Sequence, residues 1–395
     1  MNFIKSIIPI REDFSLGSLL SFEKNPMNIF LAVLIAGLFA IFAAGLYLFF
    51  TESHSAYNVH RQHPWGLLIA MYVFFVVSST GLCIISSFGH VFGIKEFEVI
   101  SKRAILGAIV TILSGFAVIV FEVGHPVTMV IYNVLTPNFT SAIWWMGTLY
   151  GAYLVAIIFE FIFLLRDDHK WSKIFGAAGL VVGIAAHSNL GAVFGFLVAR
   201  PISNGVFFPI YFILSAMITG AYILFILYGH RYKFDFSQVP DVKLMLERLA
   251  KVLTILLAIL LFFEIWRFLT SLYGGVPERA NTSIHILQSP SFIIGEVILG
   301  MLVPLLTIVL TKGKNLAAIS YASVIGMVGI FTMRYNLAHD TQVFPMQTLK
   351  LNEYQLPPSF VAYFPSFAEI AIGLGGFAIC FSLYYLANKL FDLGR

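Results

Sequence analysis

The chain has 395 residues, of which 59% are hydrophobic and 11% charged, with a mean hydropathy of +0.89. A soluble domain is closer to half apolar and a quarter charged, so this composition excludes a soluble globular protein and predicts that lipid covers much of the surface. The net charge of +4 comes from basic residues in short connections, which indicates membrane topology rather than nucleic-acid binding.

Apolar segments of membrane-spanning length follow one another along the chain. About 20 mostly apolar residues are needed to cross a bilayer as a helix. The sequence therefore predicts an all-α integral membrane protein with about ten transmembrane helices, at residues 28–50, 64–93, 103–124, 139–165, 173–196, 205–230, 248–273, 290–311, 316–337 and 365–390.

Basic residues are distributed unevenly between the two ends of these segments. Of the 24 Lys and Arg, 18 fall in the two tails and every second connection, whereas 4 fall in the other connections. Cytoplasmic loops carry the excess of Lys and Arg in membrane proteins. Both termini are therefore expected in the cytoplasm, with the chain in the inner membrane of a prokaryote. The mixed charges of residues 1–26 argue against a cleaved signal peptide.

Loop lengths suggest how the segments group. We expect two four-helix bundles, made of spans 2–5 and spans 6–9, with spans 1 and 10 beside them. The corresponding divisions are a cytoplasmic tail at 1–27, the first span and an outer loop at 28–63, the first bundle at 64–204, the second bundle at 205–337, an outer loop at 338–364, and the last span with a cytoplasmic tail at 365–395.

The span at 103–124 runs outward and ends with Glu122, which His125 follows. Helical residues three apart share one face, so a carboxylate and an imidazole are expected together near the outer surface. Such a pair could accept and relay the protons of a quinol, because histidine changes charge near neutral pH. The alternative is a contact that only fixes the helix end. Ionisable groups are costly in lipid, which favours the functional interpretation.

Two further polar residues are predicted in the outer half of the membrane. His187 is followed by Ser188 and Asn189, which favours a polar pocket over a lone interhelical hydrogen bond. Arg334 could hold a carboxylate or hydrogen-bond a quinone carbonyl, and the two alternatives are equally favoured. Together with Glu122 and His125, these residues form the predicted quinone site.

Other ionisable residues support different interpretations. His90, with Ser86 and Ser87, lies near the inner end of its span, as does Glu160 on another. They could begin a proton pathway from the cytoplasm, although His90 could equally reach surface water alone. By contrast, the pair Glu264–Arg267, three residues apart, is interpreted as a structural ion pair.

Cofactor-binding patterns are few. The two cysteines, Cys83 and Cys380, lie far apart and form no CxxC motif, so neither an iron–sulfur cluster nor a metal site is expected in this chain. A b-type haem needs histidine pairs at matching depth, and His90 and His187 are predicted at opposite depths. Haem is therefore disfavoured, and quinone (menaquinone or ubiquinone) is the expected bound substrate.

Short motifs in the order of the spans resemble those of the NrfD-like family, the membrane subunits of polysulfide-reductase-type respiratory complexes, and in particular its ten-span branch. That branch includes membrane subunits of hydrogenases, quinone reductase complexes, Dsr-type complexes and alternative complex III. The likeness covers residues 64–390. It is carried by Pro64-Trp65-Gly66, Glu122-Val123-Gly124-His125-Pro126, Pro137-Asn138-Phe139-Thr140-Ser141, His187-Ser188-Asn189-Leu190-Gly191, Glu296 with Pro304, Arg334, and Tyr363-Phe364-Pro365 with Glu369.

The resemblance implies a subunit without redox cofactors of its own, with two four-helix bundles and a quinone pocket near the outer face. A ferredoxin-like iron–sulfur subunit would dock there, with cytochrome c as one candidate among further subunits. The family's acidic pocket residue corresponds to Glu122 and its polar His/Gln position to His187. The chain departs from the family pattern in having Glu at 122 where Asp is commoner, and His125 where Arg is commoner.

The expected function is that of a quinone-interacting membrane subunit of a respiratory oxidoreductase, with proton translocation as a possible coupled activity. Two alternatives belong to other classes. A secondary transporter would need broken helices and a midplane site, which the outer clustering of ionisable residues disfavours. A passive membrane anchor would hold partner subunits without touching quinone, and would tolerate neutral replacements at Glu122 and His187.

Overall fold

The structure is a computed structural model of the chain and describes residues 9–11, 26–200, 202–345 and 360–394. Most of the predicted tail at 1–27, and residues 346–359 of the predicted outer loop, lie outside the described residues. Within the described residues the fold is all helical, and ten helical segments are long and apolar enough to cross a membrane. The predicted all-α membrane fold is therefore confirmed.

The spanning segments agree with the predicted ranges to within a few residues at most ends. They are formed by α3 (Pro26–Glu52), α4 (Leu67–His90), α5 (Ser101–Glu122) with the preceding 3-10 helix η2 (Lys95–Ile100), α7 (Ala142–Leu165), α8 (His169–Gly195), α9 (Phe207–Arg231), α10 (Pro240–Tyr273), the π-helix η3 (Ser291–Leu302) continued by α12 (Val303–Leu310), α13 (Leu316–Asp340) and α14 (Phe367–Leu390). The connections add three short helices, η1 (Ser53–Ala56), α6 (Pro126–Leu135) and α11 (Pro277–Leu287).

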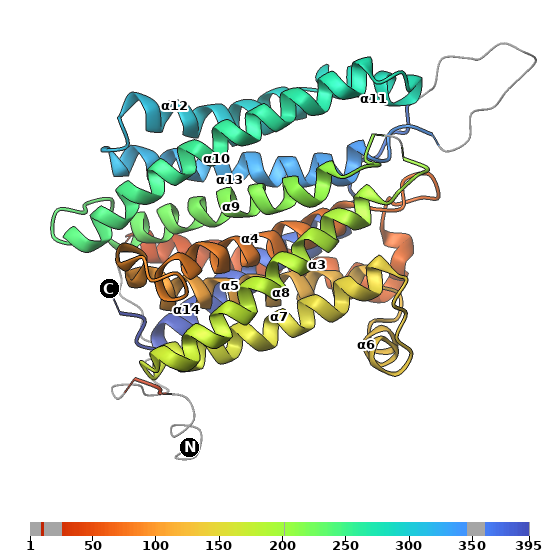
Figure 1. Cartoon of the computed structure of the whole chain (residues 1–395). Helices are drawn as coiled ribbons and strands as arrows, with labels where there is room; N and C mark the ends of the chain where they lie inside the picture. Colours follow the sequence, from red (N-terminus) through yellow and green to blue (C-terminus); the bar gives the residue numbers. More distant parts are fainter. Residues whose placement is uncertain (1–8, 12–25, 201, 346–359, 395) are drawn as a thin grey trace, which may run out of the picture.

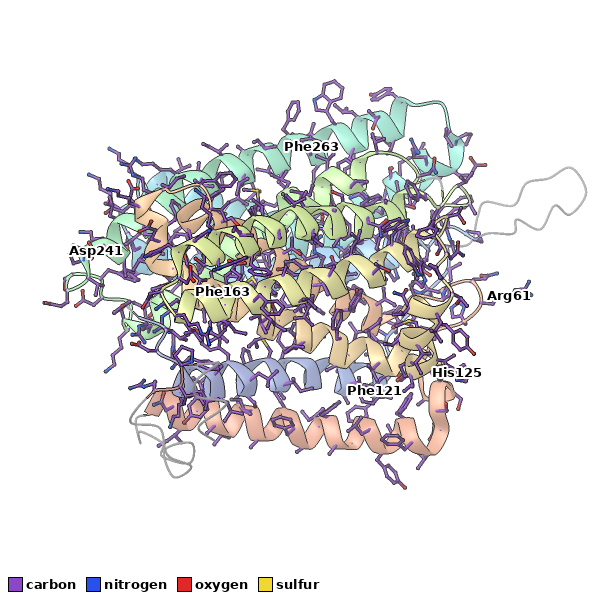
Figure 2. All side chains as sticks on the ribbon, turned by 60° about the horizontal axis from the view of Figure 1, so that its bottom comes forward. Arg61, Phe121, His125, Phe163, Asp241 and Phe263 are labelled. Atoms are coloured by element: carbon purple, nitrogen blue, oxygen red, sulfur yellow. The ribbon has the colours of Figure 1, made fainter. Side chains whose placement is uncertain are left out.

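The spanning helices run between two faces of the molecule (Figure 1). We call the face with the start of α3 and the end of α14 the terminal face. The opposite face carries α6, α11 and the described connecting residues 53–66, 196–200, 202–206, 341–345 and 360–366, and we call it the distal face. The side chains in Figure 2 follow the same division, with Asp241 at the terminal end and Arg61, Phe121 and His125 at the distal end. The distal face is the predicted outer side.

Helix contacts group the spans as expected. Helices α4, α5, α7 and α8 pack on one another as a first bundle, and α9, α10, η3 with α12, and α13 pack as a second. The bundles share a broad interface, because α4 packs on α9 and α13 and α8 packs on α9. Helix α14 lies on α4 and α5, and α3 covers α14. The residue boundaries predicted for the divisions stay predictions.

Close approach between the bundles depends on glycine. A Cβ atom at Gly81 of α4 would overlap the carbonyl oxygen of Ala216 in α9, and one at Gly220 would overlap the Gly81 backbone. Small residues let membrane helices approach closely where no water drives their association. The Gly81–Gly220 crossing therefore sets the distance between the bundles, and with it the positions of the polar side chains that lie between them.

Loop residues close the distal face over the bundle interface. The Arg200 guanidinium donates hydrogen bonds to the carbonyl oxygens of Gln342, Phe344 and Gln62, at 3.3, 2.8 and 2.9 Å. The Gln342 side chain in turn pairs with both backbone groups of Trp65. These bonds join three connections that are far apart in the sequence, so the distal loops form one structured cap.

We predict that Gly81→Ala destabilises the protein, because the added methyl group must push α4 away from α9. Overpacking of this kind costs about 1–3 kcal/mol. The measurement is the thermal unfolding midpoint of the detergent-solubilised protein. Gly37→Ala on α3 is the matched control, since a Cβ at Gly37 meets no atom within 4 Å. Equal midpoints for the two variants would contradict the proposed role of the crossing.

Candidate functional site

Glu122 is the last residue of α5, at the distal end of the helix. Carbonyl groups in the last turn of a helix lack intrahelical partners, and two are satisfied here by side chains. The Tyr57 hydroxyl donates to the Phe121 carbonyl at 3.0 Å, and His54 Nε2 donates to the Glu122 carbonyl at 3.1 Å. Burial raises the pKa of Tyr57, so its hydroxyl keeps the proton that it donates. These contacts fix the helix end that carries the Glu122 carboxylate.

The carboxylate of Glu122 is not satisfied within the described part of the chain. Its Oε2 atom is buried and has no hydrogen-bond partner there. The charged group that acts on it is Glu369 of α14, a second carboxylate. A buried carboxylate oxygen without a donor is costly, so its retention at this position needs an explanation such as an absent ligand or water.

His125 does not share a helical face with Glu122, and that prediction is wrong. Helix α5 ends at Glu122 and Val123 is extended, with φ −79° and ψ 123°. The residue before a proline disfavours the helical conformation, and Pro126 begins the separate helix α6. His125 is consequently exposed on the distal face, near Phe121 in Figure 2, and within the described residues it forms no ion pair with Glu122.

Glu369 is fully satisfied where Glu122 is not. Its carboxylate accepts hydrogen bonds from the Tyr363 hydroxyl, from the Asn58 N–H at 3.0 Å and from the Ser366 N–H at 2.9 Å. Burial and the adjacent carboxylate raise the pKa of Tyr363, so this hydroxyl remains a donor. Glu369 therefore anchors the distal loops to α14 and places a second carboxylate near Glu122.

His63 is a buried histidine that the sequence did not single out. It is 0% exposed, its ring stacks on Tyr363 at 4.3 Å between centroids, and the His339 ring lies at 5.3 Å. Neither ring nitrogen has a hydrogen-bond partner among the described residues. Burial, with a contribution from His339, lowers the pKa of His63 to about 3. His63 is therefore a neutral packing element of the distal cap at physiological pH.

His187 lies deep between the bundles with both ring nitrogens engaged. Nε2 is 3.0 Å from the Phe212 carbonyl oxygen, which can only accept, so Nε2 carries the proton. Nδ1 is then the acceptor for the Tyr150 hydroxyl at 3.1 Å. The ring thus links α8 to α7 and α9 as a neutral imidazole, and a quinone could bind it only by displacing one of these partners.

Arg334 lies beside His187, as their predicted depths suggested. The guanidinium is 0% exposed, donates from Nη2 to the Ser215 hydroxyl at 2.7 Å, and lies 5.3 Å from the centroid of the Phe212 ring. Its Nε and Nη1 atoms are buried and have no partner among the described residues. The structure therefore brings His187 and Arg334 together around Phe212, whereas Glu122 and His125 lie at the distal end of α5.

His90 and Glu160 form a close buried pair near the terminal face. His90 Nε2 lies 2.7 Å from Glu160 Oε1, and Glu160 is 0% exposed. Since His90 Nδ1 donates to the Ser86 carbonyl at 3.1 Å, a close contact on the other nitrogen requires a proton between Nε2 and the carboxylate. The Ser87 hydroxyl bonds to the Cys83 carbonyl rather than to this pair. The pair therefore holds one exchangeable proton inside the first bundle.

Tyrosines continue this polar line toward the distal face, and they were not predicted from the sequence. The Tyr153 hydroxyl lies 3.0 Å from the Ser79 hydroxyl, and Tyr150 bonds to His187. Tyr150 and Tyr153 are both fully buried on α7, three residues apart. That spacing places both phenols on one face of α7. The same spacing in the sequence could have identified the two tyrosines as a pair.

Helix α10 carries the predicted ion pair. Arg267 Nη1 lies 3.3 Å from Glu264 Oε2, and both side chains are largely buried. Glu296 of the π-helix is close by and accepts hydrogen bonds from the Tyr211 hydroxyl and the Asn336 amide, each at 3.1 Å. Within the described residues, no group of three or more His, Cys, Asp or Glu side chains is placed to hold a metal ion.

The fold and these sites define a class before any comparison. The protein is a multi-pass α-helical membrane protein with buried ionisable side chains inside and at the distal ends of two packed helical bundles. A family model described as polysulphide reductase, NrfD, matches residues 52–346. The chain belongs to the NrfD family, as its motifs indicated.

Two relatives are similar along nearly their whole length. A selenate reductase subunit from Mesobacillus selenatarsenatis is 25% identical over 390 residues, covering 87% of this chain and 89% of that protein. The Hdr-like menaquinol oxidoreductase integral membrane subunit of Archaeoglobus fulgidus is 25% identical over 386 residues, covering 94% of this chain and 95% of that protein. Both relatives are named as subunits of redox enzymes, so this chain is similar to oxidoreductase membrane subunits.

We predict that the distal cap loses stability as the pH is lowered, because His63 must stay neutral. Its folded pKa of about 3 lies below the ordinary 6.5. The stability that neutral His63 contributes to the folded protein is therefore fully present above pH 6.5 and is lost as pH falls toward 3. As the pH is lowered across this range, the thermal unfolding midpoint of His63→Gln should fall less steeply than that of the wild type. His60→Gln, at an exposed neighbour, should follow the wild type, and parallel curves for all three proteins would refute the assignment.

Proposed function

We propose that the protein is the quinone-interacting membrane subunit of a respiratory oxidoreductase complex. It would exchange electrons between an iron–sulfur subunit on the distal face and the menaquinone or ubiquinone pool. The observation that carries the proposal is the Glu122 carboxylate, which stands at the distal end of a spanning helix with a buried, unpartnered oxygen. Membership of the NrfD family and the similarity to a menaquinol oxidoreductase subunit support it.

The surroundings of Glu122 suit a lipid-soluble substrate. Helix α6 follows directly and has no buried residues, while Val127, Val130 and Val134 are 71%, 63% and 76% exposed. Such an apolar surface is stable in contact with lipid, from which a quinone would arrive. A quinone headgroup near Glu122 would therefore meet a carboxylate that needs a donor, at the boundary between the membrane and the distal surface.

The residues near this position can handle the protons of the reaction. Oxidation of a quinol releases two electrons and two protons, and a carboxylate next to the headgroup oxygen can accept one of the protons. His125, exposed beyond the helix end, can pass protons to the distal solution, which separates the roles of the two residues.

His187 and Arg334 take different roles in this proposal from those first expected. His187 has no free nitrogen, so we assign it to orienting Tyr150 rather than to direct quinone binding. Arg334 retains free N–H donors and stays a candidate for a quinone carbonyl or an ordered water. Both residues end the polar line that begins at His90 and Glu160, so they would serve proton movement through the first bundle.

This polar line supports proton translocation coupled to the quinone reaction. It comprises the His90–Glu160 pair, the phenols of Tyr153 and Tyr150, whose ring centroids are 6.4 Å apart, and His187, all inside the protein. Because basic residues gather at the terminal face, we infer that both termini are cytoplasmic and that the membrane is the inner membrane of a prokaryote. The pathway would then load protons from the cytoplasm.

We predict that Glu122→Gln lowers quinol oxidation by the intact complex by about 10²-fold, the usual contribution of a general base. Glutamine keeps the size of the side chain but cannot accept the proton. The measurement is steady-state turnover with a soluble quinol analogue in purified complex. Glu52→Gln, at an exposed acid on the same face, is the control. Unchanged turnover in the Glu122 variant would contradict the proposal and favour the alternative that the chain is a passive membrane anchor.

We predict separately that Glu160→Gln removes proton movement while sparing the distal quinone reaction. The substitution replaces the buried partner of His90 without altering the distal end of α5. Proteoliposomes with an enclosed pH indicator would report protons moved per quinol oxidised. Asp167→Asn, at an exposed acid on the terminal face, is the matched control. Full proton movement in the Glu160 variant would exclude this pathway.

A further inference from the structure

The second bundle contains a cluster of ionisable groups, of which the proposed function assigns a role only to Arg334. Glu264 and Arg267 come from α10, Glu296 from the π-helix η3, and Arg334 and Asp340 from α13. Asp340, the most exposed of the three acids, has only 8% of its surface accessible. Ionisable groups buried at membrane depth are expensive and commonly mark ion or proton sites.

The helix that carries Glu296 is unusual. Residues Ser291–Leu302 form a π-helix over 12 residues, whereas π-helical geometry normally occurs as single-turn bulges and is often found at functional positions. The wider turn changes the direction of side chains relative to an α-helix. Here it directs Glu296 into the bundle, where the carboxyl group meets the Tyr211 hydroxyl and the Asn336 amide.

Several polar atoms around Glu296 lack partners among the described residues. They include Arg267 Nε, Glu264 Oε1 and Asn336 Oδ1, all buried. A small cavity of about 10 Å³ lies beside Glu296, lined by Tyr211, Arg267, Glu296, Asn336, Asp340 and three apolar side chains. That volume is about the minimum for one water molecule, which needs two to four polar partners. The cavity supplies both donors and acceptors, so its chemistry fits water.

Charge balance in the cluster calls for one more proton. Glu264, Glu296 and Asp340 are three acids facing two cations, Arg267 and Arg334, so full ionisation would leave a net negative charge in the membrane interior. Glu264 has its ion pair with Arg267. Asp340 has the imidazole of His339, whose Nδ1 lies 3.1 Å from Oδ1. The two hydrogen-bond partners of Glu296 are both neutral.

Within the described residues, the side chains that α11 and α12 bury are uncharged. Helix α11 buries Thr282, Ser283 and Ile286, and α12 buries Pro304 and Ile308. Asp340 lines the cavity and contacts His339, so these two groups can accept a proton from it. The His339 side chain is 22% exposed and lies at the distal end of α13.

We propose that Glu296 is the protonated member of a buried acid–water site, which exchanges its proton with the distal face through Asp340 and His339. This site is separate from the polar line of the first bundle and does not require a bound quinone. It gives the second bundle a proton-binding function of its own, with water as the ligand of the cavity. The pair Glu264–Arg267, interpreted from the sequence as structural, forms one wall of the site.

The test is infrared difference spectroscopy of the full chain in lipid nanodiscs, exchanged from H2O into D2O. Wild type should show a protonated-carboxyl band that shifts on deuteration, and Glu296→Gln should remove it. Glu296→Asp, which keeps a carboxyl group, should restore a band at an altered frequency if the glutamine variant folds poorly. Glu278→Gln, at an exposed acid of α11, should keep the wild-type band. A spectrum in which Glu296→Gln removes no component of the protonated-carboxyl band would overturn the proposal.

The proposed proton route through Asp340 is tested by the rate at which the Glu296 band shifts on deuteration. Asp340→Asn should keep the Glu296 band but slow its deuteration by about tenfold or more, as loss of a relay group does. An unchanged exchange rate would exclude the route through Asp340. Glu122→Gln should leave both band and rate unchanged, because the quinone position is elsewhere. Failure of quinone binding and failure of this site would therefore be told apart in the same set of variants.

Discussion

The structure depends on one constraint, which is that polar groups inside the bilayer have no water to satisfy them. Some of the buried ionisable residues meet this constraint by pairing with one another, as His90 does with Glu160 and Arg267 with Glu264. His187 meets it by bonding to a phenol and a backbone carbonyl at once. Against this background, the unpartnered oxygen of Glu122 is informative, because it stands at the membrane boundary where a ligand can supply the missing donor.

The fold was largely predictable because hydropathy responds to the same constraint. Each spanning helix must satisfy its own backbone in lipid, so length and composition identified the ten spans correctly. The short helices α6 and α11 escaped prediction because they lie in connections, where length gives no signal. The π-helix also escaped, since no sequence pattern separates it from an α-helix in an apolar segment.

The candidate site was predicted less completely, and the reasons differ by residue. The position of Glu122 at a helix end was predicted from the sequence. Its expected contact with His125 is absent among the described residues, because the turn before Pro126 ends helix α5 at Glu122. Predicted depths put both His187 and Arg334 in the outer half of the membrane. They could not show that Tyr150 and Phe212 already occupy both nitrogens of His187, because such contacts depend on how three helices pack.

Two bundles with different polar interiors suggest a division of work. The first bundle contains a line of neutral hydroxyl, phenol and imidazole groups that starts at a proton-holding pair. The second contains a compact cluster of charged groups around a small cavity. The crossing at Gly81 and Gly220 brings the two bundles into close contact.

The central claim is that a quinone binds at the distal end of α5, and photoaffinity labelling tests it most directly. The purified complex would be irradiated with a photoreactive menaquinone analogue, with and without excess natural quinone, and the labelled peptides identified by mass spectrometry. We expect label within residues 119–135, around Glu122 and α6, that natural quinone competes away. Label confined to the second bundle, or label that natural quinone does not displace, would contradict quinone binding at this position.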